Sequence, residues 1–154
     1  MWSIFRALKG ISRRRDRTSQ ILDPSPMLEE AADWAASKLK SLGYEADFSL
    51  ESLQEVDRFL ANQSSNGEPN PNGCLVENPV RWAFAIGAYV GEVIRQKRGG
   101  SWIAPAAGLD APFDFELHLS GDLIAWPIQR VGKRIRNGEE DSLPIYGSAL
   151  IKSD

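Results

Sequence analysis

The sequence has very little of the chemistry that builds metal centres and nucleophilic sites. Cys74 is the only cysteine and His118 the only histidine among 154 residues. A single cysteine excludes an intrachain disulfide and a cysteine-built zinc site, and a single histidine excludes any site that needs two imidazoles. No spacing around either residue indicates a catalytic triad or an activated thiol. We therefore predict no catalytic residue, no metal site and no cofactor.

Long hydrophobic runs are also missing. The longest strongly apolar stretch covers residues 82–91, which is about half of the roughly 20 residues that a membrane-spanning helix needs. The glycines at positions 87, 91, 99 and 100 lack the strand–loop–helix context of a phosphate-binding loop. Hydrophobic content of 42% and charged content of 25% are ordinary for a globular protein. We expect a cytoplasmic globular protein.

Charge is distributed unevenly along the chain. Residues 1–20 contain six basic residues and one acidic residue, a net charge of +5, whereas the remaining residues carry twelve basic and twenty acidic side chains, a net charge of −8. Specific nucleic-acid binding depends on neutralising phosphates, so the acidic body argues against it. The basic segment does not resemble a secretory signal, because Arg6 and Lys9 interrupt its apolar residues and the run of arginines follows rather than precedes them.

The basic N-terminal segment combines apolar and cationic residues at helical spacing. Three interpretations stay open: contact with an anionic membrane surface, such as the inner face of a membrane; binding to an acidic partner, including the protein's own body; or a terminal helix that docks or frays. The residues proposed for membrane or partner contact are Trp2, Phe5, Arg6, Lys9, Arg13, Arg14 and Arg15.

Hydrophobic periodicity predicts helices first and strands later in the chain. We expect helices over residues 26–42, from Ser49 to a mobile polar loop at 64–73, over about 79–97, and over 127–137. Alternating patterns predict strands over 101–104, 113–119 and 123–126, the last two forming a hairpin. A last segment, 143–151, is interrupted by Pro144 and Gly147.

This order of elements predicts an α+β fold, with helices packed on a small antiparallel sheet. We divide the chain into a basic amphipathic arm and linker, residues 1–26, and one α+β domain, residues 27–154. The helix at about 79–97 is apolar on nearly every side from Trp82 to Ile94, so it is predicted to be the central core helix. Gly87 and Gly91 share one face of it, which indicates either a close packing contact or a ligand lying against the helix.

One group of polar residues forms a candidate binding site. Glu92 and Arg95 lie in the second half of the central helix, and Trp102 follows it closely. If the hairpin returns the later helix toward the central one, the cations of the later helix would share a surface with them. Arginine and tryptophan are frequent anchors at protein interfaces. The simpler alternative is an internal ion pair and a buried tryptophan. The candidate residues are Glu92, Arg95, Trp102, Arg130, Lys133 and Arg134.

Several stretches resemble a family of small uncharacterised bacterial proteins, a domain of unknown function. The likeness lies in SLESL at residues 49–53 with Val56 and Asp57, GAYVGEVIR at 87–95, and GGSW at 99–102. It continues in a PxxxVxKRxxNG pattern at 127–138 and in Asp141 to Leu143. The resemblance covers about residues 28–150 and implies a bacterial, cytoplasmic, stand-alone domain. It implies no activity and no catalytic residue.

We predict a binding or interaction protein, such as an accessory, adaptor or immunity-type protein, whose partner is another protein. Two alternatives are a small enzyme that uses carboxylate and arginine chemistry around Glu92 and Arg95, and a protein that associates with a membrane surface through its arm. An enzyme would enclose Glu92 in a concave pocket. A binding module would expose a flatter patch that carries Trp102 or the basic helix.

Overall fold

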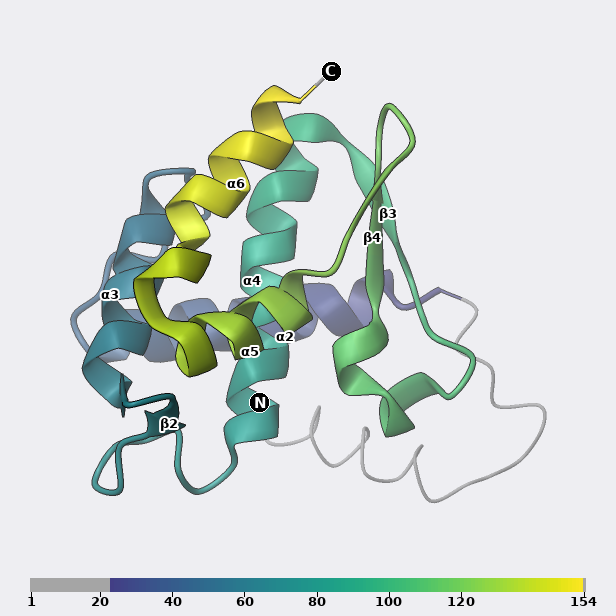
Figure 1. Cartoon of the computed structure of the whole chain (residues 1–154). Coiled ribbons are helices and arrows are strands. Elements are labelled where there is room, and N and C mark those ends of the chain that lie inside the picture. The colour runs from purple at the N-terminus through teal and green to yellow at the C-terminus, as the bar shows by residue number, and fades with distance from the viewer. Residues whose placement is uncertain (1–22, 154) are drawn as a thin grey trace.

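The computed structural model describes residues 23–153. Its helices are α2 (Ser25–Ser41), α3 (Ser52–Gln63), α4 (Pro79–Arg98), α5 (Pro127–Asn137) and α6 (Leu143–Lys152). The strands β3 (Gly100–Ile103), β4 (Glu116–Leu119) and β5 (Leu123–Ala125) form an antiparallel sheet in the order β3-β4-β5. The helices pack around α4 with this sheet at one side (Figure 1). The predicted α+β fold is confirmed, and α2 already begins at Ser25, inside the predicted linker.

Helix α4 is the centre of the core, as predicted. Asn78 caps its first turn, because its side chain accepts a hydrogen bond from the backbone N–H of Arg81 at 3.2 Å, and Pro79 follows in the first turn. Gly99, with a φ of 85°, ends the helix, whose last residue is Arg98, one residue beyond the predicted end at about residue 97. Every residue from Trp82 to Ile94 is buried. Helices α2, α5 and α6 and the sheet all contact α4, so the other elements are assembled on it.

The two glycines of α4 are sites of close packing. A Cβ atom at Gly87 would lie 2.5 Å from the Cα of Ile128 in α5, and one at Gly91 would overlap the indole ring of Trp102. Of the two sequence interpretations, the close packing contact is therefore correct. Removing two side chains from α4 lets the backbone of α5 and the ring of Trp102 approach it directly.

Gly87→Ala should lower the free energy of unfolding by about 1–3 kcal/mol, the usual cost of overpacking a core. The Cβ atom meets backbone of α5, which cannot move aside as a flexible side chain can. Gly132→Ala is the matched control, because its nearest neighbour is a ring carbon of Phe113 at 3.4 Å. That variant should gain up to about 1 kcal/mol from helix propensity. Chemical denaturation in which both variants shift alike would contradict this account.

The β-sheet presents one face to the core and one to solvent. Trp102, Leu117 and Ala125 stand opposite one another across the three strands and are buried. Ser101, His118 and Ile124 form the neighbouring row on the outer face. Trp126 follows β5 and, like Ile124, is exposed. His118 therefore lies on the outer face of the sheet.

Three segments differ from their sequence predictions. The strand expected at 113–119 is shorter, because Pro112 begins a 3-10 turn over Pro112–Asp114 and β4 starts at Glu116. The polar loop at 64–73 contains a small antiparallel hairpin, β1 (Ser64–Ser65) and β2 (Glu68–Pro69), whose turn residues Asn66 and Gly67 have φ values of 54° and 82°. Consecutive positive φ angles are typical of the Asn-Gly hairpin turn.

The last segment is helical rather than interrupted. Pro144 lies in the first turn of α6, where a proline removes no helical hydrogen bond, and the side chain of Ser142 caps the helix. Gly147 faces α3, where a Cβ atom would overlap a methyl group of Leu53. Both residues that suggested an interruption are therefore accommodated, one by its position and the other by packing.

Arg98 fixes the far end of α6. Its guanidinium donates hydrogen bonds to the carbonyl oxygens of Leu150 and Ser153 at the end of the helix. It also donates to the carbonyl of Ser120 in the β4–β5 turn, at 3.0 and 2.9 Å. One side chain at the end of α4 therefore joins the C-terminal helix and the hairpin turn.

Candidate functional site

Glu92, Arg95 and Trp102 form one cluster, as the sequence suggested, but it is closed. Arg95 donates two hydrogen bonds to the Glu92 carboxylate, at 2.6 and 3.0 Å, and the indole N–H of Trp102 donates a third at 3.0 Å. Glu92 and Trp102 are each only 2% exposed. Hydrogen bonding to Glu92 raises the pKa of Arg95, which keeps the guanidinium charged. Both oxygens of Glu92 are occupied, so the cluster holds β3 to α4.

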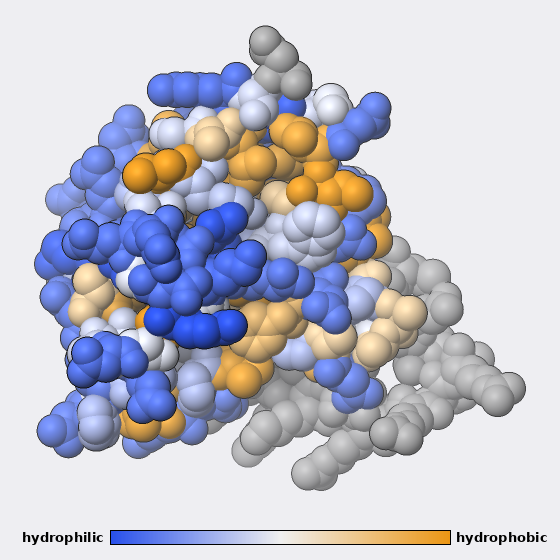
Figure 2. Space-filling view, viewed as in Figure 1, coloured by the Kyte–Doolittle hydropathy of each residue, from blue (hydrophilic) through white to orange (hydrophobic). Residues whose placement is uncertain are grey.

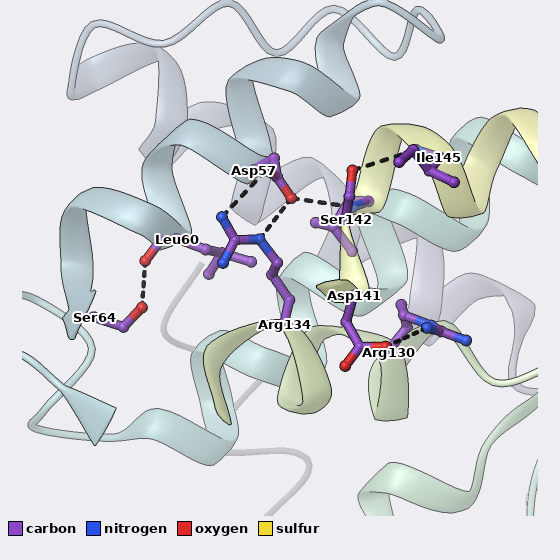
Figure 3. A network of polar contacts seen from close by, with 9 residues as sticks. Asp57, Leu60, Ser64, Arg130, Arg134, Asp141, Ser142 and Ile145 are labelled. Carbon is purple, nitrogen blue, oxygen red and sulfur yellow. Dashed lines mark hydrogen bonds and ion pairs between the residues drawn. The ribbon is translucent and has the colours of Figure 1, made fainter. Parts of the chain in front are cut away.

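The cations of α5 do not join this cluster, which corrects the expectation of one shared surface. Arg134 is 4% exposed and donates hydrogen bonds to both carboxylate oxygens of Asp57 in α3, at 2.8 and 3.2 Å. Asp57 also accepts a hydrogen bond from the backbone N–H of Leu143 at 3.0 Å. Figure 3 shows Asp57 between α5 and the start of α6. The pair joins three helices, and it leaves the guanidinium of Arg134 inaccessible to a partner.

Arg130 has a different set of contacts on the same helix. It donates to a carboxylate oxygen of Asp141 at 2.6 Å (Figure 3), and Asn137 donates to the other oxygen of that carboxylate at 2.7 Å. The guanidinium also lies over the ring of Tyr146, 4.5 Å from its centroid. A cation above an aromatic face is attractive. These contacts hold Arg130 and Tyr146 in a fixed arrangement at the edge of an open groove.

This groove lies between β5, α5 and α6 and has a volume of about 230 Å³. Its apolar lining comes from Ile124, Trp126, Tyr146 and Leu150, and its cations are Arg130 and Lys133. Ile124 is 42% exposed and Trp126 is 41% exposed. Figure 2 shows hydrophobic side chains on the visible face between α6 and the β4–β5 hairpin. Of the sequence candidates, Arg130 and Lys133 are therefore part of an accessible surface.

The residues of the groove that were not predicted from the sequence are Trp126, Ile124, Tyr146 and Leu150. The signal for the first two was the alternation of β4 and β5: with His118 facing outward, its neighbour in the next strand also faces outward. Neighbouring apolar residues on the outer face of a sheet indicate a surface that contacts another molecule. Tyr146 and Leu150 had no comparable signal, because their segment was not predicted to be a helix.

Tyr146 gives the groove a measurable property. Burial raises the pKa of its phenol to about 12, although the charge of Arg130 and a backbone hydrogen bond at Trp126 act in the opposite direction. The pKa of this phenol is higher in the folded protein than in the unfolded chain, where it is about 10. The phenol therefore stabilises the folded protein at pH values below about 10, and this stabilisation is lost as the pH rises through the pKa of the folded protein.

Tyr146→Phe should therefore lose less stability than the unmodified protein between about pH 9 and 12, by up to about 3 kcal/mol. The phenylalanine keeps the ring under Arg130 and has no proton to lose. Chemical denaturation at a series of pH values measures the difference. Stability curves that stay parallel over this range would contradict the assignment of the raised pKa to Tyr146.

A larger cavity, of about 370 Å³, lies between the β1–β2 hairpin and the end of α5. No aromatic residue lines it, and its buried cation, Arg134, is held by Asp57. The backbone of Gly67 lies close to that of Arg136, since a Cβ atom there would be 2.9 Å from the carbonyl oxygen. The cavity is therefore a gap beside two packed backbone segments.

Cys74 and His118 have ordinary environments. Burial raises the pKa of the Cys74 thiol, which is the opposite of what an activated nucleophile requires. The Nε2 atom of His118 lies 3.4 Å from a carboxylate oxygen of Glu116 on the outer face of the sheet. Within residues 23–153, no three metal-binding side chains of the His, Cys, Asp and Glu types come together.

Two further observations concern membranes. None of the helices in the described part of the chain has both the length and the apolar character that crossing a bilayer requires. The arm residues Trp2, Phe5, Arg6, Lys9, Arg13, Arg14 and Arg15 lie outside the described residues. Their proposed contact with a membrane or a partner stays a prediction.

No known family model, curated protein or solved structure matches this chain. The resemblance to small bacterial proteins therefore also stays a prediction.

Proposed function

We propose that this chain is a non-enzymatic interaction protein that binds another protein through the groove between β5, α5 and α6. The observation that carries the proposal is Trp126, a large aromatic side chain that is 41% exposed beside Ile124 and the cations of α5. Tryptophan provides a large apolar surface at little cost in conformational entropy, and it is enriched among residues that dominate binding energy. The proposal includes the role predicted from the sequence, that of a bacterial, cytoplasmic accessory, adaptor or immunity-type protein.

The environment of Glu92 supports binding over catalysis. A general acid or base must reach the proton that it transfers. The carboxylate of Glu92 is 3% exposed and already accepts hydrogen bonds from Arg95 and Trp102. An enzyme built around Glu92 and Arg95 would first have to break these contacts, whereas Trp126 and Lys133 are accessible without any rearrangement.

The proposal is tested by cross-linking from the groove in the cells that make the protein. A photo-reactive amino acid in place of Gln129, which lines the groove, should give an adduct with one partner protein. The same group in place of Asp33, an exposed residue of α2, should not give that adduct. The identified partner is then purified and its affinity for the full chain is measured by calorimetry.

Trp126→Ala should weaken the binding of this partner by about tenfold or more, the effect of removing an interface anchor. Val80→Ala is the control, because Val80 is also exposed but lies at the start of α4. Circular dichroism checks that both variants fold. Equal affinities for the Trp126 variant and the unmodified protein, or no adduct from position 129, would reject the groove as the binding site.

A further inference from the structure

We infer that the segment of the partner that enters this groove carries a large apolar side chain next to one or more carboxylates. This inference rests on the proposed function and goes further, because it states the chemistry that the groove selects. The inference has two parts. The first concerns the apolar residues that form the floor of the groove, and the second concerns the charge of the residues at its rim.

The floor favours an apolar side chain. The side chains between β5 and α6 are those of Ile124, Trp126, Tyr146 and Leu150. The phenol of Tyr146 is largely withdrawn from water, and this burial raises its pKa. A groove of about 230 Å³ is large enough for one aromatic or branched aliphatic side chain, but smaller than the sites of about 300–1,000 Å³ that usually hold small-molecule ligands.

The rim favours negative charge. Its charged residues are Arg130 and Lys133, and no acidic residue lines the groove. Asp141 already neutralises Arg130 at 2.6 Å. Lys133 is exposed, and within residues 23–153 it makes no ion pair. Lys133 is therefore the cation that is available to a partner.

The negative charge of the rest of the described chain makes this positive rim selective for an acidic partner. Residues 23–153 carry twelve basic and nineteen acidic side chains, a net charge of −7. A strongly acidic partner would be repelled by most of this surface and attracted at the groove, and such complementarity sets orientation and specificity. The same negative charge disfavours wide contact of residues 23–153 with an anionic lipid surface, so a protein segment is the better occupant of the groove.

Selection from a random peptide library displayed on phage tests the inference on the full chain. Peptides that bind the unmodified protein should share an apolar residue beside Asp or Glu. Their binding should fall at least tenfold in Trp126→Ala and should weaken as salt is added. Lys133→Glu should shift the selected charge from acidic to basic residues, and Lys97→Glu, an exposed lysine of α4, should not.

The outcomes separate the two proposals. Peptides that need Trp126 but carry no acidic preference, or an unchanged preference in Lys133→Glu, would overturn the inferred chemistry and leave the protein-binding groove in place. Peptides that bind equally well to Trp126→Ala, or no enrichment at all, would overturn both. Binding of phosphatidylglycerol vesicles that is lost in the Trp126 and Lys133 variants, with no selected peptides, would identify a membrane surface instead.

Discussion

Asp57→Ala should lower the free energy of unfolding by about 3–5 kcal/mol, the usual result of removing one partner of a buried ion pair. The guanidinium of Arg134 is 4% exposed and would lose both of its hydrogen bonds to the carboxylate. The backbone N–H of Leu143 would lose its acceptor as well. Three helices therefore lose a common connection through one substitution.

Denaturation in urea, followed by tryptophan fluorescence, measures this effect. Asp33→Ala is the matched control, because Asp33 is an exposed aspartate in α2, and its effect should be within about 0.5 kcal/mol. Asp57→Asn should be intermediate, since an amide oxygen can still accept from Leu143 but does not carry the charge that pairs with Arg134. A loss below about 1 kcal/mol in Asp57→Ala would show that the pair contributes little to the fold.

Tyr89→Ala should have an effect of similar size, about 3–5 kcal/mol, because it empties the space of a large buried side chain. Tyr89 is fully buried in α4, and its ring centroid lies 4.5 Å from that of Phe48. Its hydroxyl shares a hydrogen bond of 2.7 Å with Ser52 and accepts one of 2.9 Å from the backbone of Phe48. Burial raises the pKa of this phenol.

Tyr89→Phe separates packing from hydrogen bonding. It keeps the ring and loses only the hydroxyl, so it should cost about 1–3 kcal/mol, the penalty for leaving a buried polar partner unsatisfied. Thermal or chemical unfolding of both variants gives the comparison. If the alanine variant were no less stable than the phenylalanine variant, the ring of Tyr89 would not be the central packing element that the structure indicates.

The sequence predicted the central helix well because several independent signals agreed on it. Asn78, Pro79 and Gly99 mark its ends, and the apolar residues between them leave almost no polar face. The contact sites of Gly87 and Gly91 followed from their spacing, but their partners did not. Ile128 is distant along the chain, and although Trp102 follows α4 closely, only the packed fold brings its ring onto Gly91.

The site was predicted less well because charge pairing depends on tertiary structure. Sequence spacing placed Glu92 near Arg95, and this pair exists. Nothing in the local sequence shows that Arg134 is paired with Asp57, which lies 77 residues earlier. Trp102 lies in β3 and Trp126 directly follows β5, yet one is 2% exposed and the other 41%. The strand register, rather than residue type, decides which tryptophan a partner can reach.

Helix α6 is held at both ends, by the carboxylate of Asp57 at its first residue and by Arg98 at its last carbonyl groups. One wall of the groove is therefore rigid before any partner arrives. Association with such a wall needs little ordering of the protein, and preorganisation of this kind increases affinity without new contacts. The backbone of α6 should consequently have nearly the same conformation in the free and the bound protein.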